Sequence, residues 1–381
     1  MREKTTVYLA LGSNLGKRYV QLQQAVFALG EHLGSVSRVS AIYENQAVGF
    51  TGGDFLNACI ALETTLPPDE VLSILLATEE EMGRTRGQGE HYTSRTIDID
   101  LLYYGVEIIA TDQLTVPHPK MASRNFVLKP LADIAPQVYH PQLNKDTRNL
   151  LQESRDPHPL QKTPFRLFRD RQALFHQLHF LAIEGTIGAG KTTLSKKIAE
   201  DFNAKLVLER FADNPFLPKF YEEQSRYAFP LEMSFLADRY QQFTEDTSQF
   251  DLFKNFMVSD YDIFKSLIFA GITLQKDEFE LYRKVFGFMY NEVKKPDIYV
   301  YLYQNTDRLL AHIQKRGRAY EQNISRDYLN QINRGYLDFI KGHPQQTSLI
   351  INLENLDFVA RPEDYEQVLK AIETKLLESL F

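Results

Sequence analysis

The chain has 381 residues, more than one hydrophobic core usually organises, and this length predicts two domains of about 100 to 200 residues each. Hydrophobic residues make up 43% and charged residues 24%, and no stretch approaches the roughly 20 apolar residues that a membrane span needs. The net charge of −7 disfavours nucleic acid as a partner, and the single cysteine, Cys59, excludes an intrachain disulfide and a thiolate zinc site.

The first part of the chain mixes strand and helix patterns. Its N-terminal apolar run is shorter than the core of a signal peptide, so we expect a cytoplasmic protein whose first strand lies at 7–10. Helical patterns follow at 21–33 and 69–82, and a second strand-like run covers 97–103. The sequence therefore predicts an α+β domain over residues 1–151.

Two aspartates mark the second of these strands. Asp98 and Asp100 are at positions i and i+2, so both carboxylates face the same side of the strand. Two anions this close repel one another unless a cation lies between them, and Mg²⁺ favours oxygen ligands. Taken alone, the pair fits a magnesium site and an exposed strand face equally well.

Several motifs surround this pair in a fixed order. They are YLALGSNLG at 8–16, FLNA at 55–58, GRTRG at 83–87, SRTIDIDLLYYG at 94–105 and VPHPKMASRNFVLKPLADIAP at 116–136. Over roughly residues 5–145 they resemble the hydroxymethyl-dihydropterin pyrophosphokinases of folate synthesis. The resemblance implies a ferredoxin-like α+β fold and Mg²⁺-dependent transfer of pyrophosphate from ATP to the alcohol of 6-hydroxymethyl-7,8-dihydropterin, with release of AMP.

The same resemblance implies roles for individual residues. Asp98 and Asp100 would bind two Mg²⁺ ions, and Asn57 would bond the pterin edge. Phe55 and Phe126 would stack on the ring, although both side chains could simply be core. The residues expected to handle the polyphosphate, as catalytic groups, are Arg84, Arg95, His118 and Arg124, of which His118 could also be an ordinary loop residue.

Two features depart from the family pattern. Asn45, Gln46 and Ala47 stand where the family commonly has Thr and Pro in a loop that lines the pterin pocket. The Gly-rich loop between Arg86 and Arg95 is one residue longer than in a common family form. We expect these changes to affect pterin affinity or loop closure, with the aspartate pair and the arginines intact.

Between residues 152 and 177 the composition shifts to Pro, His, Arg and Gln, and three prolines discourage a continuous helix. We predict a linker here, with a short helix at 169–178 as the alternative. Beyond it, runs at 179–183 and 298–303 read as buried strands separated by long helical segments. The sequence predicts an α/β domain over residues 178–381, with a parallel sheet flanked by helices.

The segment GTIGAGKT follows the first of these strands and opens a helix, as a P-loop does. Glycines let backbone N–H groups surround phosphate, the helix N-terminus adds partial positive charge, and the lysine reaches the outer phosphates. A Gly-rich turn with a chance lysine is the less favoured alternative. The predicted ATP-binding residues are Gly185, Thr186, Ile187, Gly188, Ala189, Gly190, Lys191 and Thr192, and Thr192 would also help to hold Mg²⁺.

A P-loop indicates a nucleotide but not a reaction. The motifs that follow it are LVLER at 206–210, NPFLPKFYEEQSRYAFPLE at 214–232, LADRY at 236–240, SDYD at 259–262 and KRGRAYEQ at 315–322. Over residues 179–341 they resemble the deoxynucleoside kinase family, which includes bacterial deoxyadenosine and deoxyguanosine kinases. The resemblance implies transfer of the γ-phosphoryl group of ATP to the 5′-hydroxyl of a deoxynucleoside.

In this resemblance Glu209 is the base that takes the proton of the 5′-hydroxyl. Tyr221 and its partner Glu321 would meet the sugar 3′-oxygen, and Arg316 and Arg318 would close over the phosphates as a lid. A solvated glutamate and a solvated Arg-Gly-Arg are the alternatives from the residues alone.

Base recognition is assigned to Arg239 and Glu232. Many relatives have Gln at the second position, and because a carboxylate only accepts hydrogen bonds, Glu232 favours bases that present donors, which points toward purines. Tyr261 departs from the pattern, since many relatives have Arg after the acidic residue. Either another arginine such as Arg239 compensates, or the chain belongs to a subgroup built differently.

Two other functions fit parts of the sequence. The second domain could be a nucleoside-monophosphate kinase, and the first could be a pterin- or ATP-binding module without catalysis. We expect small-molecule substrates and no nucleic acid or membrane partner. We also expect a homodimer formed through the aromatic residues between Phe264 and Tyr290, although this stripe could equally be core.

Overall fold

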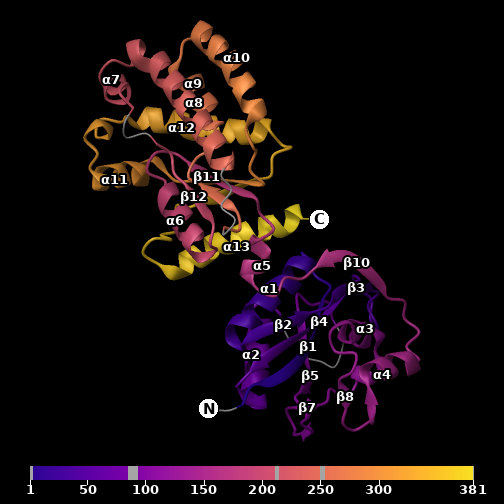
Figure 1. Cartoon of the computed structure of the whole chain (residues 1–381). Helices are drawn as coiled ribbons and strands as arrows, with labels where there is room; N and C mark the ends of the chain where they lie inside the picture. The colour runs from indigo at the N-terminus through magenta and orange to yellow at the C-terminus, as the bar shows by residue number, and fades with distance from the viewer. Residues whose placement is uncertain (1–2, 85–92, 211–213, 249–253, 381) are drawn as a thin grey trace. The chain divides into compact units, whose positions relative to one another are not determined.

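The computed structural model describes residues 3–84, 93–210, 214–248 and 254–380. The chain divides into two compact units, Met1–Leu174 and Phe175–Leu380, which Figure 1 shows in one colour sequence from indigo to yellow. Among the described residues no helix is both long and apolar enough to cross a membrane. The Gly-rich loop between Arg86 and Arg95 falls mostly outside the described residues.

The first unit is built on an antiparallel sheet. Its elements are β1 (Thr5–Ser13), α1 (Arg18–His32), β2 (Ser35–Val39), β3 (Ala41–Asn45), β4 (Phe55–Thr64), α2 (Pro68–Glu81), β5 (Asp98–Tyr104), β6 (Ile109–Ala110), β7 (Thr115–Val116), η1 (Met121–Ser123), α3 (Asn125–Ile134), β8 (Tyr139–His140), β9 (Lys145–Asp146), α4 (Thr147–Glu153) and β10 (Gln161–Arg166). The sheet order is β10-β3-β4-β1-β5, and β2 also pairs with β4. The predicted strands and helices of this domain correspond to β1, α1, α2 and β5, although the predictions for α1, α2 and β5 each extend one residue beyond the observed element.

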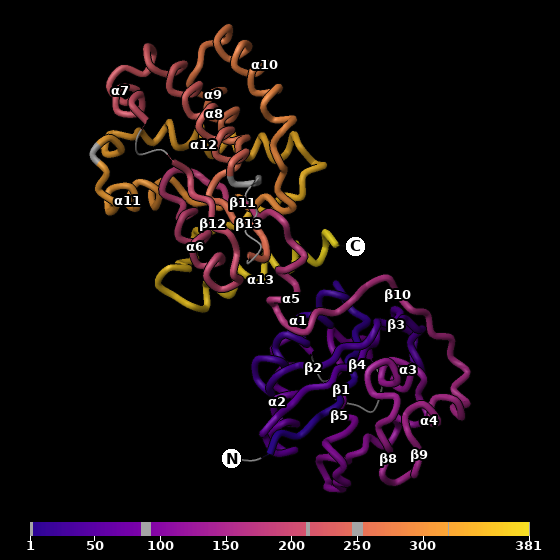
Figure 2. The backbone as a smooth tube through the Cα atoms, in the orientation of Figure 1, coloured from indigo at the N-terminus to yellow at the C-terminus, as the bar shows by residue number. Residues whose placement is uncertain are grey.

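Side chains alternate between the two faces of this sheet because successive residues of a strand point in opposite directions. Tyr8, Cys59 and Ala61 pack with α3 residues such as Val127 and Leu131 on one face. The helices α1 and α2 contact each other and the strands β1, β4 and β5, as the trace in Figure 2 shows. Each hydrophobic face of the sheet is therefore covered by helices.

Strand register brings the predicted site residues together. In the pairing of β1 with β5, Gly12 lies opposite Asp98 and Ala10 opposite Asp100. In the pairing of β1 with β4, Gly12 also lies opposite Asn57. Gly12 leaves space between Asp98 and Asn57, since a Cβ at this position would lie 3.4 Å from the Asn57 side chain.

The predicted linker at 152–177 is only partly a linker. The strand β10 within it pairs antiparallel with β3, with Gln161 opposite Glu44, and extends the sheet of the first unit. Pro164 fits this position because β10 is an edge strand, where a missing N–H interrupts no central ladder. The alternative short helix is present as α5 (Arg171–Phe175).

The second unit is built on a parallel sheet. Its elements are β11 (Phe180–Gly185), α6 (Lys191–Asp201), β12 (Lys205–Val207), α7 (Leu217–Glu222), α8 (Gln224–Ser248), β13 (Met257–Ser259), α9 (Lys265–Thr273), α10 (Lys276–Glu292), β14 (Ile298–Tyr303), α11 (Thr306–Arg316), η2 (Ala319–Glu321), α12 (Arg326–Gly342), β15 (Ser348–Asn352) and α13 (Pro362–Ser379). The sheet order is β12-β13-β11-β14-β15, with every pair parallel. The predicted parallel sheet is confirmed.

Helices cover both faces of this sheet (Figure 1). The helices α6 and α13 contact the strands on one face, and α8, α9, α10 and α12 supply the core on the other. At the carboxyl ends of three neighbouring strands, β11 leads into the P-loop, β12 leads toward Glu209 and β13 leads into Asp260. Ligand sites of open parallel sheets lie at this edge.

Candidate active sites

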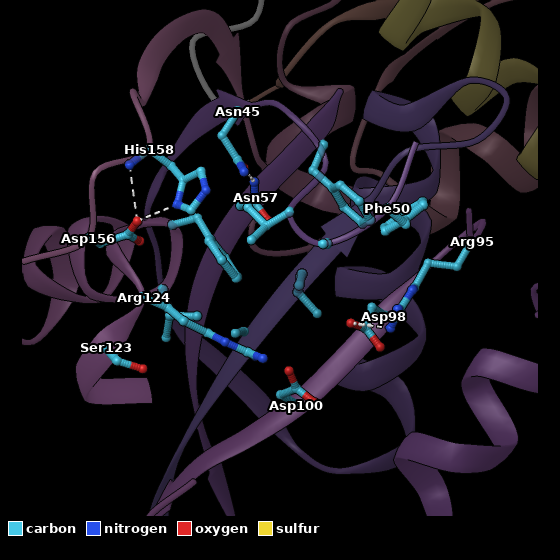
Figure 3. A pocket seen from close by; sticks show the side chains of 18 of the residues that line it. Asn45, Phe50, Asn57, Arg95, Asp98, Asp100, Ser123, Arg124, Asp156 and His158 are labelled. Carbon is cyan, nitrogen blue, oxygen red and sulfur yellow. Dashed lines mark hydrogen bonds and ion pairs between the residues drawn. The ribbon is translucent and has the colours of Figure 1, made fainter. Parts of the chain in front are cut away.

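A cavity of about 540 Å³ opens in the first unit, beside the aspartate pair (Figure 3). Its lining divides into a charged end and an end of amide and aromatic side chains. The residues that the argument uses are Asn45, Phe55, Asn57, Arg95, Asp98, Asp100, Arg124, Phe126, Asp156 and His158. The arrangement fits a flat polar ring at one end and an anionic chain at the other.

Two guanidinium groups hold Asp98. Arg84 Nη1 lies 2.7 Å from Asp98 Oδ1, and Arg95 Nη1 lies 2.8 Å from Asp98 Oδ2. Burial raises the pKa of Asp100, and the charge of Asp98 raises it further, while His118, Arg124 and Arg84 oppose the shift. The neighbouring cationic side chains therefore offset the repulsion between the two carboxylates.

His118 faces the same pair. Its Nε2 lies 4.0 Å from Asp100 Oδ1, and burial lowers the pKa of the imidazole although Asp100 opposes this. A neutral imidazole is therefore favoured beside Asp100 until negative charge increases nearby.

Sequence reasoning missed Glu79, which orients Arg84. This carboxylate is buried on α2, accepts a hydrogen bond of 2.8 Å from Ile99 N, and pairs directly with the Arg84 guanidinium. A signal was present, because Glu79 follows the buried residues Val71 and Leu75 at helical spacing, where an acid needs a partner.

At the other end of the cavity, Asn57 Nδ2 donates to Asn45 Oδ1 at 2.6 Å. Asn45 is the last residue of β3 and one of the three residues that depart from the family pattern, so an unusual residue contacts Asn57, the residue predicted to bind the pterin edge. Phe55 and Phe126 both line the cavity and are only partly buried, with the Arg124 guanidinium 5.5 Å from the Phe126 ring centroid. This placement agrees with ring-stacking positions better than with core positions.

The segment after α4 adds a wall that sequence reasoning missed. Asp156 Oδ2 accepts a hydrogen bond of 2.7 Å from Asn125 N, and its Oδ1 lies 2.6 Å from His158 Nδ1. Burial would raise the pKa of Asp156, but hydrogen bonds from Asn125 and His158 outweigh it and hold the pKa below its usual value. No local sequence motif indicates these residues, since they reach the cavity only through contacts with a segment about 31 positions earlier in the chain.

In the second unit the P-loop joins β11 to α6. Gly188 and Gly190 have φ of 87° and 91°, where L side chains are strained, and a Cβ on Gly190 would lie 2.9 Å from the Phe358 ring. Lys191 Nζ donates to Gly185 O at 2.8 Å, and burial lowers its pKa to about 8. The loop therefore presents its backbone and its lysine at the N-terminus of α6.

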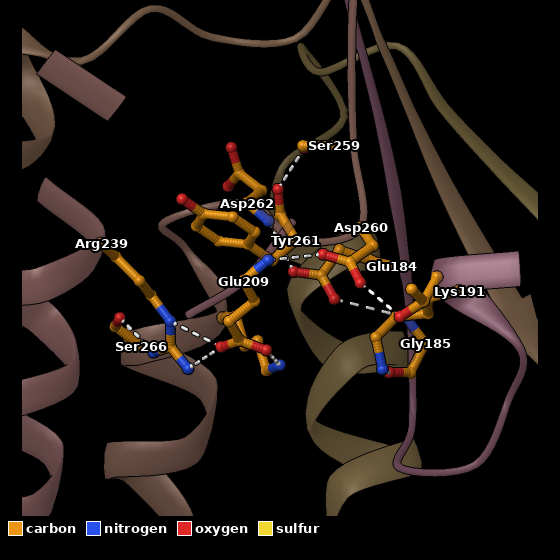
Figure 4. Close-up of polar contacts among 12 residues, drawn as sticks. Glu184, Gly185, Lys191, Glu209, Arg239, Ser259, Asp260, Tyr261, Asp262 and Ser266 are labelled. Carbon is orange, nitrogen blue, oxygen red and sulfur yellow. Dashed lines mark hydrogen bonds and ion pairs between the residues drawn. The ribbon is translucent and has the colours of Figure 1, made fainter. Parts of the chain in front are cut away.

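Asp260 connects the P-loop to the next strand and was not among the predicted site residues. Its Oδ2 accepts a hydrogen bond from the Thr192 hydroxyl, and its Oδ1 accepts one of 2.8 Å from Glu209 N (Figure 4). One carboxylate thus fixes both the P-loop hydroxyl and the start of the Glu209 segment.

Cations hold Glu209 on both oxygens. Arg239 Nε and Nη2 donate to Oε1 at 3.0 and 2.5 Å, and Lys265 Nζ donates to Oε2 at 2.6 Å. Burial would raise the pKa of Glu209, but the charges of Lys265 and Arg239 outweigh it and hold the pKa well below its usual range. The residue is therefore a carboxylate at every physiological pH.

The lid arginines both contact Glu321. The Arg316 guanidinium pairs with it directly, and Arg318 Nη1 lies 3.2 Å from Glu321 Oε1. Tyr320 stacks on Tyr221 with ring centroids 6.1 Å apart. The lid and the predicted sugar residues are thus one connected group.

The buried Glu232 carboxyl accepts a hydrogen bond of 3.0 Å from the Thr273 hydroxyl. Burial raises its pKa to about 7. A cavity of about 120 Å³ brings together most of the predicted kinase side chains, namely Ile187, Lys191, Thr192, Glu209, Tyr221, Glu232, Arg239, Arg316, Arg318 and Glu321. Thr186 does not line it, because its side chain is buried and its hydroxyl donates to Asn333 Oδ1.

Comparison with known proteins gives two matches along the chain. The family "Deoxynucleoside kinase" matches residues 181–378, and the family "7,8-dihydro-6-hydroxymethylpterin-pyrophosphokinase (HPPK)" matches residues 8–136. The chain belongs to both families. The predicted fusion is therefore confirmed, and the protein is a transferase composed of a pyrophosphokinase unit and a deoxynucleoside kinase unit.

Individual relatives match each unit over most of their length. A deoxyguanosine kinase from Bacillus subtilis (strain 168) is 39% identical over 194 residues, which are 50% of this chain and 93% of the relative. A 2-amino-4-hydroxy-6-hydroxymethyldihydropteridine pyrophosphokinase from the same organism is 46% identical over 133 residues, 34% of this chain and 78% of the relative. A solved deoxyadenosine kinase from M. mycoides, with dCMP and a flexible dCDP bound, is 23% identical and has a TM-score of 0.45 over 51% of this chain and 99% of that one.

Two residues of the kinase unit bear on the missing family arginine. Arg239, which was assigned to the base edge, lines the cavity, and its guanidinium donates to Glu209 and, through Nη1 at 2.6 Å, to Ser266 Oγ. Tyr261, which replaces the family arginine, is fully buried and packs 4.8 Å from the Phe243 ring in the core. The cation beside Glu209 is thus supplied by Arg239, as one alternative held, and also by Lys265, which the sequence did not indicate.

Proposed function

We propose that the pyrophosphokinase unit transfers the β,γ-pyrophosphoryl group of ATP to the hydroxymethyl oxygen of 6-hydroxymethyl-7,8-dihydropterin and releases AMP. One observation carries this proposal, the single cavity that joins the Asp98–Asp100 end to the Asn57 end. In the reaction the pterin oxygen forms a bond to the β-phosphorus, the bond from that phosphorus to the AMP oxygen breaks, and the hydroxyl proton passes to solvent. The order β3-β4-β1-β5 with α1 and α2 supports the ferredoxin-like assignment of this unit.

The donor set at the charged end fits Mg²⁺. Two carboxylates on one strand face offer hard oxygen ligands. Burial and, after it, the charge of Asp98 raise the pKa of Asp100, and a bound cation would offset both effects. Asp98 and Asp100 would hold the ions. Bound Mg²⁺ would neutralise the triphosphate and help to align its β-phosphorus.

The remaining residues act on the two substrates directly. Arg84 and Arg95, which pair with Asp98, would also bind the polyphosphate when it enters, together with Arg124 and His118. Phe55 and Phe126 would stack on the pterin, and Asn57 would bond its edge.

The decisive experiment measures AMP. Purified protein with ATP, Mg²⁺ and 6-hydroxymethyl-7,8-dihydropterin should form AMP in proportion to the pterin added. Pterin binding without AMP formation would instead identify a binding module and overturn the catalytic proposal.

We propose that the second unit transfers the γ-phosphoryl group of ATP to the 5′-hydroxyl of a deoxynucleoside. The observation that carries it is one cavity shared by Lys191, Glu209 and the lid arginines. The 5′-oxygen forms a bond to the γ-phosphorus, the bond from the γ-phosphorus to the β,γ-bridging oxygen breaks, and ADP leaves. The hydroxyl proton passes to Glu209 and from there to solvent.

The low pKa of Glu209 refines its role in this step. A carboxylate whose pKa lies so far below neutral pH is a weak base. This is sufficient here, because phosphoryl transfer needs little proton removal before the oxygen–phosphorus bond forms. Glu209 therefore orients the 5′-hydroxyl first and accepts its proton late. Lys191, Arg316 and Arg318 neutralise the transferred phosphoryl group, and Thr192 would hold Mg²⁺ through the hydroxyl that Asp260 orients.

We propose a purine deoxynucleoside as the preferred acceptor. The deoxyguanosine kinase of Bacillus subtilis matches 93% of its length here, and Glu232 offers a buried carboxyl to donor groups of a base. Tyr221 and Glu321 would favour a free 3′-hydroxyl. Purified protein with ATP and each of the four natural deoxynucleosides tests the preference, and dAMP in place of deoxyadenosine tests the monophosphate-kinase alternative.

The assembly proposal concerns α10. Phe264 and Phe286 belong to the core, whereas Leu281 and Phe288 are 53% and 78% exposed and seven residues apart on one helix face. We propose that this face takes part in a homodimer, which sedimentation of the wild type and a Phe288→Glu variant would test. A cytoplasmic location also remains a proposal, and we propose that the boundary between the two domains lies after β10 rather than at residue 151.

A further inference from the structure

The sequence leaves the cation beside Glu209 unexplained, because Tyr261 stands where the family has arginine. In the structure two N–H groups of Arg239 donate to Glu209 Oε1, and none of the described contacts of Arg239 is with Oε2. The Lys265 ammonium lies at that second oxygen, 2.6 Å away. Two cations therefore divide the carboxylate between them.

We propose that Lys265 is a positioning residue of the kinase reaction, which holds the Glu209 carboxylate in the orientation that receives the 5′-hydroxyl. The proposal rests on the proposed phosphorylation of a deoxynucleoside. A carboxylate has about four lone-pair directions. Arg239 takes two at Oε1 and Lys265 one at Oε2, which leaves one direction at Oε2 for the substrate hydroxyl.

The backbone fixes where Lys265 lies. Asp262 N donates to Glu184 Oε1 at 2.8 Å, and the Asp262 side chain in turn accepts from Phe264 N at 2.9 Å. Lys265 N donates to Asp262 O at 3.1 Å, and Lys265 is the first residue of α9. The loop between β13 and α9 thus carries the ammonium to Glu209 from a rigid base.

Lys265 and Glu209 form a buried ion pair rather than an exposed surface pair. Lys265 is 7% exposed and Glu209 has a side chain 11% exposed, and removing a lysine charge from water is unfavourable unless a close anion compensates. The Phe269 ring lies 5.5 Å from the ammonium and covers it on another side. The lysine is therefore held in one geometry, as a group that orients another must be.

The test compares Lys265→Met, Lys265→Arg, Glu209→Gln and the double variant Glu209→Gln/Lys265→Met in the full-length chain. For Lys265→Met we expect kcat of deoxynucleoside phosphorylation to fall roughly 100-fold, since misplacement of a catalytic group by about 1 Å has this effect, with KM for ATP unchanged. Lys265→Arg keeps the charge and should recover most of kcat. Lys276→Met, an exposed lysine at the start of α10, is the matched control and should behave as wild type.

The double variant separates positioning from a structural role. If Lys265 acts through Glu209, Glu209→Gln/Lys265→Met should have the same kcat as Glu209→Gln alone. Losses that multiply, or an unchanged kcat in Lys265→Met, would overturn the proposal. AMP formation by the pyrophosphokinase unit of the same chains measures the amount of active protein.

If Lys265→Met does not fold, Lys265→Ala with added ethylammonium replaces it. A kcat that rises with the concentration of ethylammonium supports the proposal, and a kcat that stays low overturns it. A wild-type chain that phosphorylates no deoxynucleoside would refute the proposed kinase function and this inference with it. An active wild type with multiplying losses refutes the role of Lys265 alone.

Discussion

Asp156 accepts a hydrogen bond of 2.7 Å from the backbone N–H of Asn125, a residue that lies 31 positions earlier and begins α3. Asn125 Nδ2 also donates to Asp156 O at 3.2 Å. Since Arg124 and Phe126 flank Asn125, the contact fixes the position of the segment that carries both, and we propose that Arg124 binds the polyphosphate and that Phe126 stacks on the pterin. A segment after α4, outside the matched family range, thus shapes the site.

The Asp156 contact predicts a selective effect on substrate binding. Asp156→Ala removes a hydrogen bond to a charged acceptor, typically 1.5 to 3 kcal/mol, so KM for the pterin should rise by roughly tenfold or more. The kcat of AMP formation should change less, because Asp98 and Asp100 stay in place. Steady-state kinetics measure both constants, and Asp112→Ala, on an exposed loop, is the control. An unchanged KM for the pterin would contradict the positioning role.

The aspartate pair predicts a loss confined to one unit. Asp98→Asn or Asp100→Asn removes a hard ligand and should lower AMP formation by at least about 100-fold, with a higher Mg²⁺ concentration needed for half-maximal rate. Deoxynucleoside phosphorylation by the same protein should be unaffected, since it depends on the P-loop. Parallel assays of AMP and of deoxynucleoside monophosphate, over a range of Mg²⁺ concentrations, check this. If both activities fell together, the loss would be one of folding rather than of metal binding.

Glu209 predicts a loss of chemistry without a loss of ATP binding. Glu209→Gln keeps the shape but removes the charge, and general-base groups contribute roughly 10² to 10⁴-fold, so kcat should fall within that range. Arg239 and Lys265 then lack their anion, so the variant should also unfold at a lower temperature. Equilibrium ATP binding and single-turnover phosphorylation measure the two properties, with Glu222→Gln as an exposed control. Unchanged turnover would refute the assigned role.

Local motifs predicted what depends on neighbouring residues in the chain. The strand, glycines and helix of the P-loop are consecutive, and Asp98 and Asp100 share a face because strand geometry repeats every two residues. Lys265 was missed for the opposite reason. It contacts a residue 56 positions away, and only the packing of α9 against α8 and the sheet brings the two together.

The linker shows the same limit for the fold. The composition of 152–177 correctly discourages a long helix, but it does not reveal that Gln161 and Lys162 pair with β3, since an edge strand tolerates proline and polar side chains. Arg239 is a milder case. Its position in the LADRY motif suggested the base, whereas its direction in space is set by the Glu209 carboxylate.

Glu232 predicts how stability and base binding depend on pH. Its pKa of about 7 in the folded protein exceeds the ordinary value of 4.5, so the folded state binds its proton more tightly than the unfolded state. The stabilising contribution of this proton is therefore complete below about pH 4.5 and is lost as pH rises through 7. Glu232→Gln, which cannot ionise, should be less affected by this loss.

Denaturant unfolding of the kinase unit at pH 5 and pH 8 measures this difference. The free energy of unfolding of Glu232→Gln minus that of the wild type should be larger at pH 8 than at pH 5, because only the wild type loses the contribution of the Glu232 proton. Asp262 also has a pKa raised by burial to about 7, so part of the wild-type slope should persist in the variant. Protonation also gives the Glu232 carboxyl an O–H donor, whereas the ionised carboxylate only accepts hydrogen bonds. The KM for a purine deoxynucleoside should therefore vary between pH 6 and 8 in the wild type, and it should vary less in Glu232→Gln. Equal pH profiles of KM in the two proteins would show that Glu232 does not contact the base.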